Sequence, residues 1–476
     1  MSLKKAATSG AFWTFLDVFI GRGIGIVAAV VLARMLSPRE FGLMGMIYIF
    51  TGIANSLVDS GMSSSLIRDK NAGYLDFTTV FYTNLFFALL IYLILFLGAP
   101  YIAIFYQEQA LKIIVRVYGL LVIINAFSAV QIAILTRSMN FKNLMILNLP
   151  GILIGAIVGI SLAFHGWQVW SLIYMHLLTQ TIYSLLLWMR SEWKPSLYFS
   201  KKSLYTHFSF GYKLMLSGLL NTVFDNLYNV LIGKFFSVTS LGYFERARKF
   251  NLYPVTILTS IIGKVTYPLL SEIQGERERL GSIYRQLLQF IFFTVAPVMI
   301  LLSIVAKPLF LLLLGEQWNE AGEMFAILCL SASLYPLHIF NLNLLKVEGR
   351  SDLFLRLEII KKVITLAVVL VSFSFGIKGL VWGMVVTSVL ALMVNTYYTN
   401  QLIKYSLSNQ LYDMRYTIIA LFMMYIGSKQ LTFVLTDFTL WFQIVLPLLF
   451  GIFVFVGVNI VVKNPSIQLI TQTFGN

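Results

Sequence analysis

The stretch that decides the fold runs from Asn143 to Met189 and reads NLMILNLPGILIGAIVGISLAFHGWQVWSLIYMHLLTQTIYSLLLWM. It contains no Asp, Glu, Lys or Arg, and it is about twice as long as the roughly 20 apolar residues that one bilayer-spanning helix requires. Near its middle stand His165, Gly166 and Trp167, a polar and aromatic group that suits a turn at a membrane interface. The stretch therefore predicts two spanning helices joined by a short turn.

The rest of the chain shares this character. Of the 476 residues, 58% are hydrophobic and 12% are charged, whereas an ordinary globular domain is about 25% charged. Further runs without acidic or basic residues cover 77–107, 324–345, 379–403 and 438–462. A soluble protein of this length needs a charged surface that these residues cannot form, so the composition excludes a soluble enzyme and a disordered protein. It predicts a polytopic membrane protein.

The same pattern along the whole chain predicts an all-α protein of fourteen transmembrane helices. We expect these helices at residues 10–36, 41–66, 77–98, 111–135, 144–164, 168–189, 208–236, 241–270, 284–306, 321–345, 353–375, 379–401, 413–430 and 440–462. The first is expected to be a retained helix and not a signal peptide. Asp17 and Arg22 interrupt its apolar run, and no cleavage signal follows.

A short motif occurs twice, 200 residues apart. Residues 34–43 read RMLSPREFGL, and residues 234–243 read KFFSVTSLGY. Each copy joins one expected helix to the next, and together they pair the first helix with the seventh, as a six-plus-six duplication requires. Such repeats are parallel, and their transport pathway lies between the halves. We therefore expect an N-terminal lobe at 1–200, a C-terminal lobe at 201–405 and two additional helices in 406–476.

The charge of the chain reflects its orientation in the membrane. It has 35 Lys and Arg against 20 Asp and Glu, a formal net charge of +15. Placing the N-terminus in the cytoplasm puts most of the basic residues in inner loops, as the positive-inside rule requires. We therefore expect both termini in the cytoplasm, membrane lipids as surroundings and no nucleic-acid partner. The outer loops are too short for a catalytic domain, and the single cysteine, Cys329, is expected to be a buried apolar side chain.

Ionisable residues inside the expected helices indicate function, because one at the bilayer centre costs about 2.5–3.5 kcal/mol. They concentrate in the first two helices of each repeat, which suggests a wet and mainly cationic cavity between the halves. The candidate substrate-binding cations are Arg22, Arg116, Arg246, Arg248, Lys249 and Lys264. The candidate ion-coupling or ion-paired acids are Asp17, Asp59 and Asp225.

Each of these residues also has a structural interpretation. Arg22 could form an ion pair with Asp17 or Asp59, and Asp225 could bind a coupling cation or pair with a lysine. Lys264 follows Arg246 by 18 residues, or five helical turns, so both would lie on one basic face of their helix. Interfacial snorkelling would equally explain Arg246 and its basic neighbours.

A cationic cavity suits an anionic substrate, such as a phosphate or pyrophosphate on a lipid carrier. The sequence lacks the residue patterns that several other activities require. The pair Gly263-Lys264 is followed by Val265, so it does not complete a nucleotide-binding phosphate loop. The four histidines show no metal-ligand spacing. We therefore expect a protein that is not an enzyme, with no cofactor other than a coupling cation, Na⁺ or H⁺.

Several short motifs point to one family. They are Val31–Leu43, Leu57–Met62 with Leu66-Ile67, Leu241–Ala247, Leu314–Trp318 and Gly349–Asp352. In this order they resemble the Wzx-like polysaccharide (O-antigen and exopolysaccharide) flippases of the multidrug/oligosaccharidyl-lipid/polysaccharide exporter superfamily. The resemblance covers much of the chain.

This resemblance implies fourteen helices in two lobes around a central cavity, working by alternating access. It implies translocation of undecaprenyl-pyrophosphate-linked oligosaccharide across the bacterial cytoplasmic membrane. The related lipid II flippases use basic residues on their first helix, to which Arg22 could correspond. They also carry an Arg-Asp pair where this chain has Ala28-Ala29, and this difference argues against lipid II as the substrate.

Two other functions compete with this interpretation. A cation-coupled multidrug antiporter of the same superfamily should have a more acidic cavity. A membrane enzyme of polysaccharide assembly usually carries a large outer loop. The sequence leaves open which sugars are carried, which ion is coupled, and whether a polysaccharide polymerase or glycosyltransferases act as partners.

Overall fold

The computed structural model describes residues 20–21 and 23–467, and for residues 256–269 and 351 it describes the backbone alone. Within these residues the chain consists of helices and short connections, without a strand. Ten helical segments of the described chain are long and apolar enough to cross a membrane. The chain is therefore an all-α polytopic membrane protein, as the sequence predicts.

The chain folds into two compact units, residues 1–242 and 243–476. Two helices beyond residue 200, α9 and α10, pack in the first unit against α2 and α4. The predicted boundaries at residues 200 and 405 concern a sequence duplication, which this packing does not measure, and they stay a prediction.

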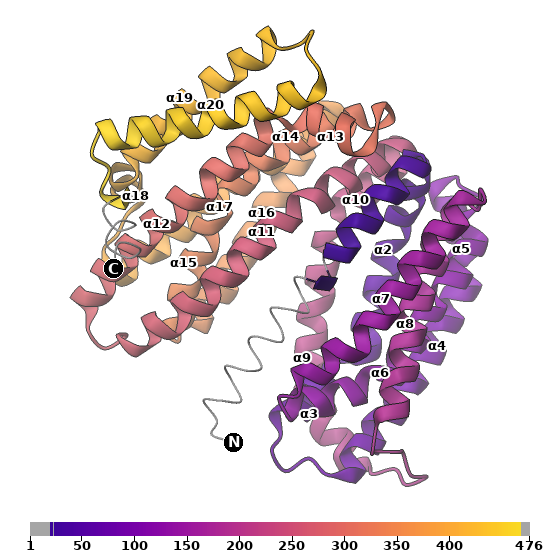
Figure 1. Ribbon diagram of the computed structural model, residues 1–476. Coiled ribbons are helices and arrows are strands. Elements are labelled where there is room, and N and C mark those ends of the chain that lie inside the picture. The colour runs from indigo at the N-terminus through magenta and orange to yellow at the C-terminus, as the bar shows by residue number, and fades with distance from the viewer. Residues whose placement is uncertain (1–19, 22, 468–476) are drawn as a thin grey trace. The chain divides into compact units, whose positions relative to one another are not determined.

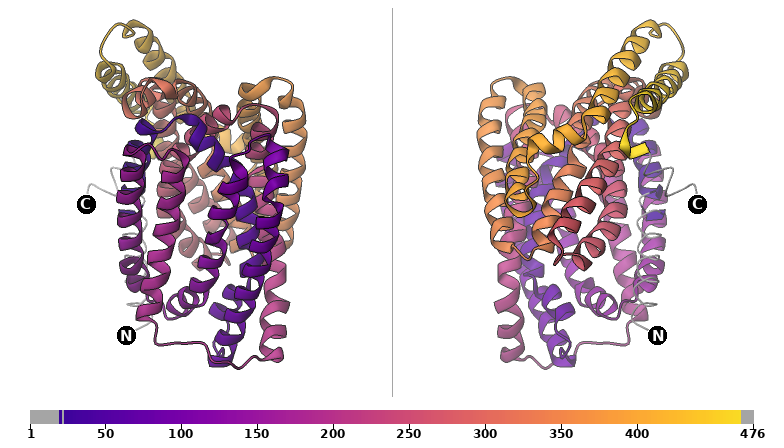
Figure 2. Two further views of the ribbon diagram at one scale, coloured as in Figure 1. Left: turned by 90° about the vertical axis from the view of Figure 1, so that its right-hand side faces the viewer. Right: turned by 90° about the vertical axis from the view of Figure 1, so that its left-hand side faces the viewer.

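The first unit is a bundle of helices that run nearly parallel to one another (Figures 1 and 2). The apolar helix Gly23–Met35 precedes the other members. These are α2 (Pro38–Asp59), α3 (Met62–Arg68), α4 (Tyr74–Tyr106), α5 (Leu111–Tyr118), α6 (Leu120–Arg137), α7 (Phe141–Phe164), α8 (Val169–Arg190), α9 (Lys201–Asp225) and α10 (Leu227–Phe235).

The charge-free stretch forms the hairpin of α7 and α8, and its turn has Gly166 at φ 79°. The two helices pack closely because α7 has a glycine every four residues. A Cβ atom on Gly155 would overlap the Thr179 side chain of α8, and one on Gly159 would lie 2.8 Å from the Met175 Cβ. Small residues at such a spacing are what allow membrane helices to approach.

Four predicted helices are each divided in the structure: 41–66, 111–135 (between α5 and α6), 208–236 and 321–345 (between α14 and α15). The expected helix at 41–66 ends at Asp59, because Ser60 and Gly61 take positive φ angles of 46° and 65°. Gly61 lies against the backbone of Gly211 in α9, where neither residue has room for a Cβ atom. The expected helix at 208–236 is divided at Asn226, between α9 and α10.

The two copies of the repeated motif contact each other in the structure. A Cβ atom on Gly42 of α2 would overlap the carbonyl oxygen of Val238, and one on Gly242 would overlap the carbonyl oxygen of Pro38. All four residues lie in the first unit. Gly242 follows Gly42 by 200 residues and Val238 follows Pro38 by 200 residues, so equivalent residues exchange equivalent contacts. This reciprocity is the mark of a two-fold relation between the two motif copies.

The second unit contains α11 (Val238–Glu272) from Tyr243 onward and ten further elements. These are α12 (Arg277–Ile304), α13 (Ala306–Leu314), the 3₁₀ turn η1 (Glu316–Trp318), α14 (Asn319–Ser333), α15 (Tyr335–Val347), α16 (Ser351–Phe373), α17 (Gly376–Ile403), α18 (Leu407–Asp413), α19 (Arg415–Val434) and α20 (Leu440–Val461). The hairpin of α19 and α20 packs on α12 and α13 through a core that includes Phe293, Met424 and Phe455.

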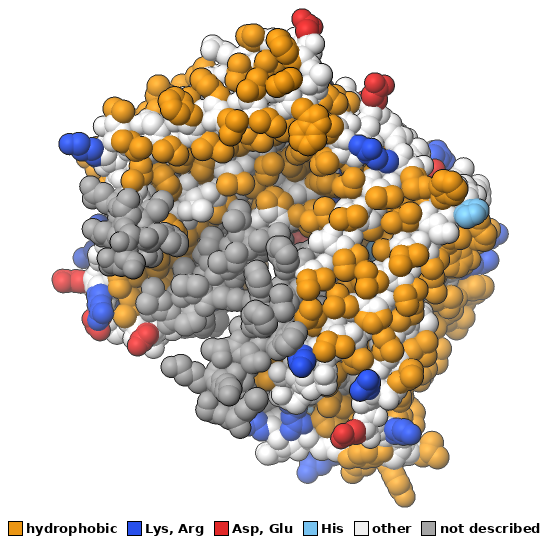
Figure 3. Space-filling model, in the orientation of Figure 1, with side chains coloured by type: hydrophobic (Ala, Val, Ile, Leu, Met, Phe, Trp, Pro, Cys, Tyr) orange, Lys and Arg blue, Asp and Glu red, His pale blue; other side chains and the backbone are white. Residues whose placement is uncertain are grey.

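The surface fits a lipid environment. Hydrophobic side chains cover the sides of the helices in the view of Figure 3, and Lys and Arg side chains gather at the lower end of the first unit. Large apolar side chains such as Phe86, Leu93 and Leu97 of α4 are exposed. In water such a surface would be unfavourable, whereas in a bilayer it is covered by acyl chains.

We expect Gly242→Ala and Gly42→Ala to destabilise the protein by about 1–3 kcal/mol or more, because the new methyl group meets backbone that cannot move aside. Gly98→Ala in α4 is the matched control, since nothing lies within 4 Å of its Cβ position. Thermal unfolding in detergent measures the difference. Equal melting temperatures for Gly242→Ala and Gly98→Ala would contradict this description of the motif contact.

Candidate functional site

Helix α9 carries a polar stripe along an exposed side. It comprises Ser209, Lys213, Ser217, Asn221 and Asp225, which recur every four residues and are all exposed. Residues at this spacing lie on neighbouring positions of a helix surface. Within the described chain α9 is long enough to span a membrane but is not apolar enough to count among the ten candidate spans. Polar side chains on a helix inside a bilayer need water or protein around them.

The opposite side of α9 fixes the helix to the first unit. Ser203, His207 and Gly211 are buried there, again four residues apart. His207 Nδ1 lies 2.9 Å from the Ser65 hydroxyl, and His207 Nε2 lies 3.3 Å from a carboxylate oxygen of Asp76. These contacts orient the polar stripe away from α2, α3 and α4. The sequence singled out Asp225 alone of the stripe, although the four-residue period was visible.

Asp59 lies in a pocket of the first unit that polar and apolar side chains line together. The pocket has a volume of about 300 Å³ and is lined by α2, α3, α6 and α8. Its polar side chains are Asn55, Asp59, Ser63, Asn125, Ser128 and Gln180. Asn125 Nδ2 donates a hydrogen bond to Asn55 Oδ1 over 3.0 Å. Asp59 makes no ion pair in the part of the chain that the structure describes.

The chain geometry explains how this pocket forms. Asn55, Val58 and Asp59 share one side of α2, and the turn at Ser60 and Gly61 returns the chain so that Ser63 joins them. One carboxylate among neutral amide and hydroxyl oxygens is a set of hard ligands that suits a small cation, and the carboxylate alone can carry a proton. The sequence identified Asp59 but missed its neutral neighbours.

Arg116 makes its contacts within the first unit. Its Nε donates to the carbonyl oxygen of Phe96 over 3.2 Å, and its guanidinium carbon lies 4.3 Å from the centre of the Phe96 ring. Arg116 therefore connects α5 to α4. Whether it also contacts a substrate stays a prediction.

The first turns of α11 carry the other predicted cations. Glu245 and Arg246 are each 5% exposed, and Lys249 Nζ lies 3.8 Å from Glu245 Oε2. Arg248 is half-buried beside them. Three basic side chains thus accompany one carboxylate within a little more than one turn. Within residues 245–249 basic groups therefore outnumber acidic ones.

A buried tryptophan joins two of the sequence motifs. The guanidinium carbon of Arg246 lies 5.7 Å from the centre of the Trp318 ring, and the Tyr243 ring lies 6.1 Å from it. Trp318 is fully buried. The motif at Leu241–Ala247 therefore packs against the motif at Leu314–Trp318 inside the second unit. The aromatic face holds Arg246 by a cation–π contact.

Three predicted site residues cannot be placed. Asp17 and Arg22 lie outside the described residues, and Lys264 lies where the structure describes the backbone alone. The predicted basic face shared by Arg246 and Lys264 and the predicted cavity between the halves therefore stay predictions.

The Glu245 carboxylate should stabilise the basic segment of α11. We expect Glu245→Gln to destabilise the protein by about 1–3 kcal/mol, less than a fully buried pair because Lys249 is partly solvated. The control is Glu276→Gln, whose partner Arg279 lies 3.2 Å away in an exposed pair and which should cost less than about 1 kcal/mol. Thermal unfolding compares the two. A larger effect at Glu276 would contradict the importance of Glu245.

The described geometry defines a class of protein. Beside the ten apolar candidate spans, the described chain has a polar stripe on α9, a pocket that contains a carboxylate and a buried basic segment near the start of α11. Such groups mark substrate and ion pathways in membrane transport proteins.

Comparison with known proteins identifies the family. A family model described as "Polysaccharide biosynthesis protein" matches residues 31–323. The chain therefore belongs to this polysaccharide biosynthesis protein family, and the predicted resemblance to polysaccharide flippases is confirmed.

Named relatives extend over most of the chain. The lipopolysaccharide biosynthesis protein WzxC of Escherichia coli is 23% identical over 82% of this chain and 80% of its own length. The succinoglycan biosynthesis transport protein ExoT of Rhizobium meliloti is 25% identical over 81% and 78%. The teichuronic acid biosynthesis protein TuaB of Bacillus subtilis is 24% identical over 74% and 73%.

Solved structures show the same fold. The lipid II flippase MurJ in an inward closed conformation matches with a TM-score of 0.74 at 15% identity, covering 95% of this chain and 99% of that one. An inward-facing multidrug resistance transporter of the MATE family matches with a TM-score of 0.64 at 17% identity, covering 80% and 94%. At these identities the likeness concerns the fold alone.

Proposed function

We propose that this chain is a flippase that translocates undecaprenyl-pyrophosphate-linked oligosaccharide across the bacterial cytoplasmic membrane by alternating access. The oligosaccharide would then serve polysaccharide assembly. The family and the names of the relatives support a role in polysaccharide biosynthesis. The observation that carries the proposal is the basic segment of α11, because Arg246, Arg248 and Lys249 place three basic groups within a little more than one helical turn, a set that suits an anionic substrate.

The proposed substrate is chemically matched to this segment. Pyrophosphate is a multiply charged anion, and guanidinium groups bind it through short, charge-assisted hydrogen bonds. Arg246 is held against Trp318, so its orientation is set before substrate arrives. Arg248 and Lys249 would add charge on the same turn of the helix. The polar stripe of α9 would provide solvated contacts for hydroxyl-rich sugars.

The proposed driving force is a cation gradient acting at Asp59. Its pocket combines one carboxylate with the oxygen atoms of amides and hydroxyls, which suits Na⁺ or H⁺. Asp225, at the end of α9, is exposed, whereas Asp59 is half-buried. Asp59 is therefore the stronger of these two candidates for the coupling residue.

The proposed orientation places both termini in the cytoplasm, following the basic inner loops. Lipid-linked oligosaccharide would enter from the inner leaflet, and polymerase or glycosyltransferase partners would act before or after translocation. The proposed activity is transport alone, without bond formation. A multidrug antiporter shares the fold, but the basic character of α11 favours an anionic substrate over a cationic one.

The location of lipid-linked oligosaccharide in cells depleted of the chain tests the function. We expect the oligosaccharide to accumulate on the cytoplasmic leaflet, protected from a membrane-impermeant glycan reagent in intact cells. Re-expression of the chain should restore exposure outside. A normal distribution together with increased retention of cationic dyes would instead support an antiporter. Unpolymerised units on the outer face would instead support an assembly enzyme.

The coupling role of Asp59 has its own test. We expect Asp59→Asn to lower transport by about tenfold or more, since a lost charged contact of about 1.5–3 kcal/mol corresponds to that factor. The residual transport should no longer respond to Na⁺ or pH gradients. Asp437→Asn, in an exposed loop, is the matched control. An unchanged gradient response in Asp59→Asn would exclude Asp59 as the coupling residue.

A further inference from the structure

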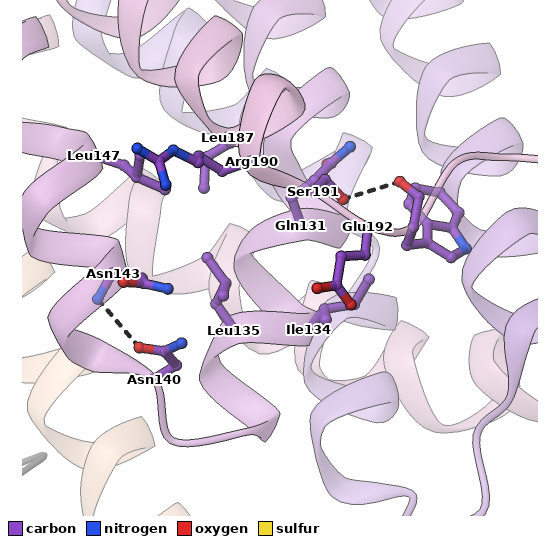
Figure 4. A pocket seen from close by; sticks show the side chains of 11 residues that line it. Gln131, Ile134, Leu135, Asn140, Asn143, Leu147, Leu187, Arg190, Ser191 and Glu192 are labelled. Atoms are coloured by element: carbon purple, nitrogen blue, oxygen red, sulfur yellow. Dashed lines mark hydrogen bonds between the residues drawn. The ribbon is translucent and has the colours of Figure 1, made fainter.

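A second polar pocket lies at the ends of α6, α7 and α8 in the first unit (Figure 4). Its volume is about 360 Å³. It is lined by the end of α6, the start of α7, the end of α8 and the segment that follows α8. None of the sequence-predicted site residues belongs to it.

Two side chains that line this pocket, Gln131 and Trp193, have buried polar groups with no hydrogen-bond partner among the described residues. Gln131 is 2% exposed, and neither its amide nitrogen nor its amide oxygen has a hydrogen-bond partner. The indole Nε1 of Trp193 is also buried without a partner. Buried polar groups are nearly always hydrogen-bonded in folded proteins. Gln131 therefore brings an unpaired hydrogen-bond donor and acceptor into the lining of the pocket.

The rim of the pocket adds further hydrogen-bonding groups. Arg190, Asn143 and Glu192 are exposed there, and Arg190 and Glu192 form no ion pair in the described chain. Asn140 Oδ1 accepts from the Asn143 backbone N–H over 3.2 Å, which leaves the Asn140 amide nitrogen as a donor. Figure 4 shows Arg190, Asn140 and Asn143 on one side of the pocket and Glu192 on another.

Contacts within and around the lining hold the walls of the pocket in place. The Ser191 hydroxyl donates to the carbonyl oxygen of Trp193 over 2.9 Å. The Trp193 ring lies 5.8 Å from the ring of Phe81 and 6.3 Å from that of Trp188. Arg137 donates to the carbonyl oxygen of Ala72 over 2.8 Å, which connects α6 to the loop before α4. A site built this way is preformed, so a ligand need not order it.

We infer that this pocket binds a saccharide unit. Gln131, Asn140 and Asn143 offer neutral donors and acceptors, and Arg190 and Glu192 offer one charge of each sign. This balance suits the hydroxyl groups of a sugar, each of which donates and accepts. A phosphate dianion would be repelled by Glu192, and a metal cation would be repelled by Arg190.

The inference rests on the proposed function for its biological meaning. Arg137, Lys142, Arg190 and Lys194 surround this end of the helices, and the positive-inside rule assigns such an end to the cytoplasm. Lipid-linked sugars would meet the flippase on that side. The pocket would then recognise part of the oligosaccharide before translocation, separately from the cations proposed to bind its pyrophosphate.

Saturation-transfer difference NMR on the full-length protein in nanodiscs tests the binding. The probes are the methyl glycosides of glucose, galactose, N-acetylglucosamine and glucuronic acid. We expect transfer to at least one glycoside, reduced about fivefold or more by Gln131→Leu and by Asn143→Leu because hydrogen bonds to the sugar are lost. Gln109→Leu, at an exposed position, should keep the signal. Thermal unfolding of each variant verifies that it folds.

Each other outcome overturns the inference. No transfer to any glycoside, or unchanged transfer in both pocket variants, would mean that the pocket holds only water. Displacement of the glycoside by millimolar inorganic phosphate would assign the pocket to an anion.

Complementation in depleted cells separates this inference from the proposed function. We expect Gln131→Leu to restore export less well than Gln109→Leu. If depletion traps oligosaccharide inside and Gln131→Leu restores export fully, the flippase function stands and the sugar pocket is wrong. If depletion has no effect on the location of the oligosaccharide, the proposed function is wrong, even if glycosides bind to the pocket.

Discussion

The cost of placing charge and unpaired polar groups in a bilayer is the constraint on which this molecule depends. Backbone N–H and C=O groups avoid this cost because they pair with one another in helices throughout the described chain. Polar side chains gather in a few places: the Asp59 pocket, the α11 segment against Trp318 and the exposed polar stripe of α9. These groups cost insertion energy that an inert helix bundle would avoid. Their presence is the physical reason to assign the chain a transport pathway.

Close backbone contact does much of the packing, because lipid gives no hydrophobic drive for one apolar helix to join another. Gly155 lets α8 approach α7, and Gly61 meets Gly211 where α9 crosses the turn after α2. Gly42 and Gly242 likewise allow the backbones of the two motif copies to approach each other. The same contact that ends α2 at Asp59 also brings Ser63 into the pocket, so packing and the candidate ion site share one cause.

The sequence predicted the hairpin of α7 and α8 well, because a long charge-free stretch leaves few alternatives. It missed the division after Asp59, which depends on Gly211, a residue far away in the chain. It found Asp59 because charge in an apolar helix is conspicuous. It missed Asn55, Asn125 and Gln131, because neutral amides are common and only their burial distinguishes them. The contact of Arg246 with Trp318 needed the fold, since no local pattern joins those residues.

Translocation by the purified chain tests the central claim most directly. The chain would be reconstituted in vesicles with undecaprenyl-pyrophosphate-linked oligosaccharide on the inner leaflet, and a membrane-impermeant glycosidase added outside would report its arrival. We predict release of sugar that depends on the chain and falls about tenfold or more in Arg246→Ala with Arg248→Ala, as expected for lost charge-assisted contacts. Release no faster than in protein-free vesicles would contradict the account.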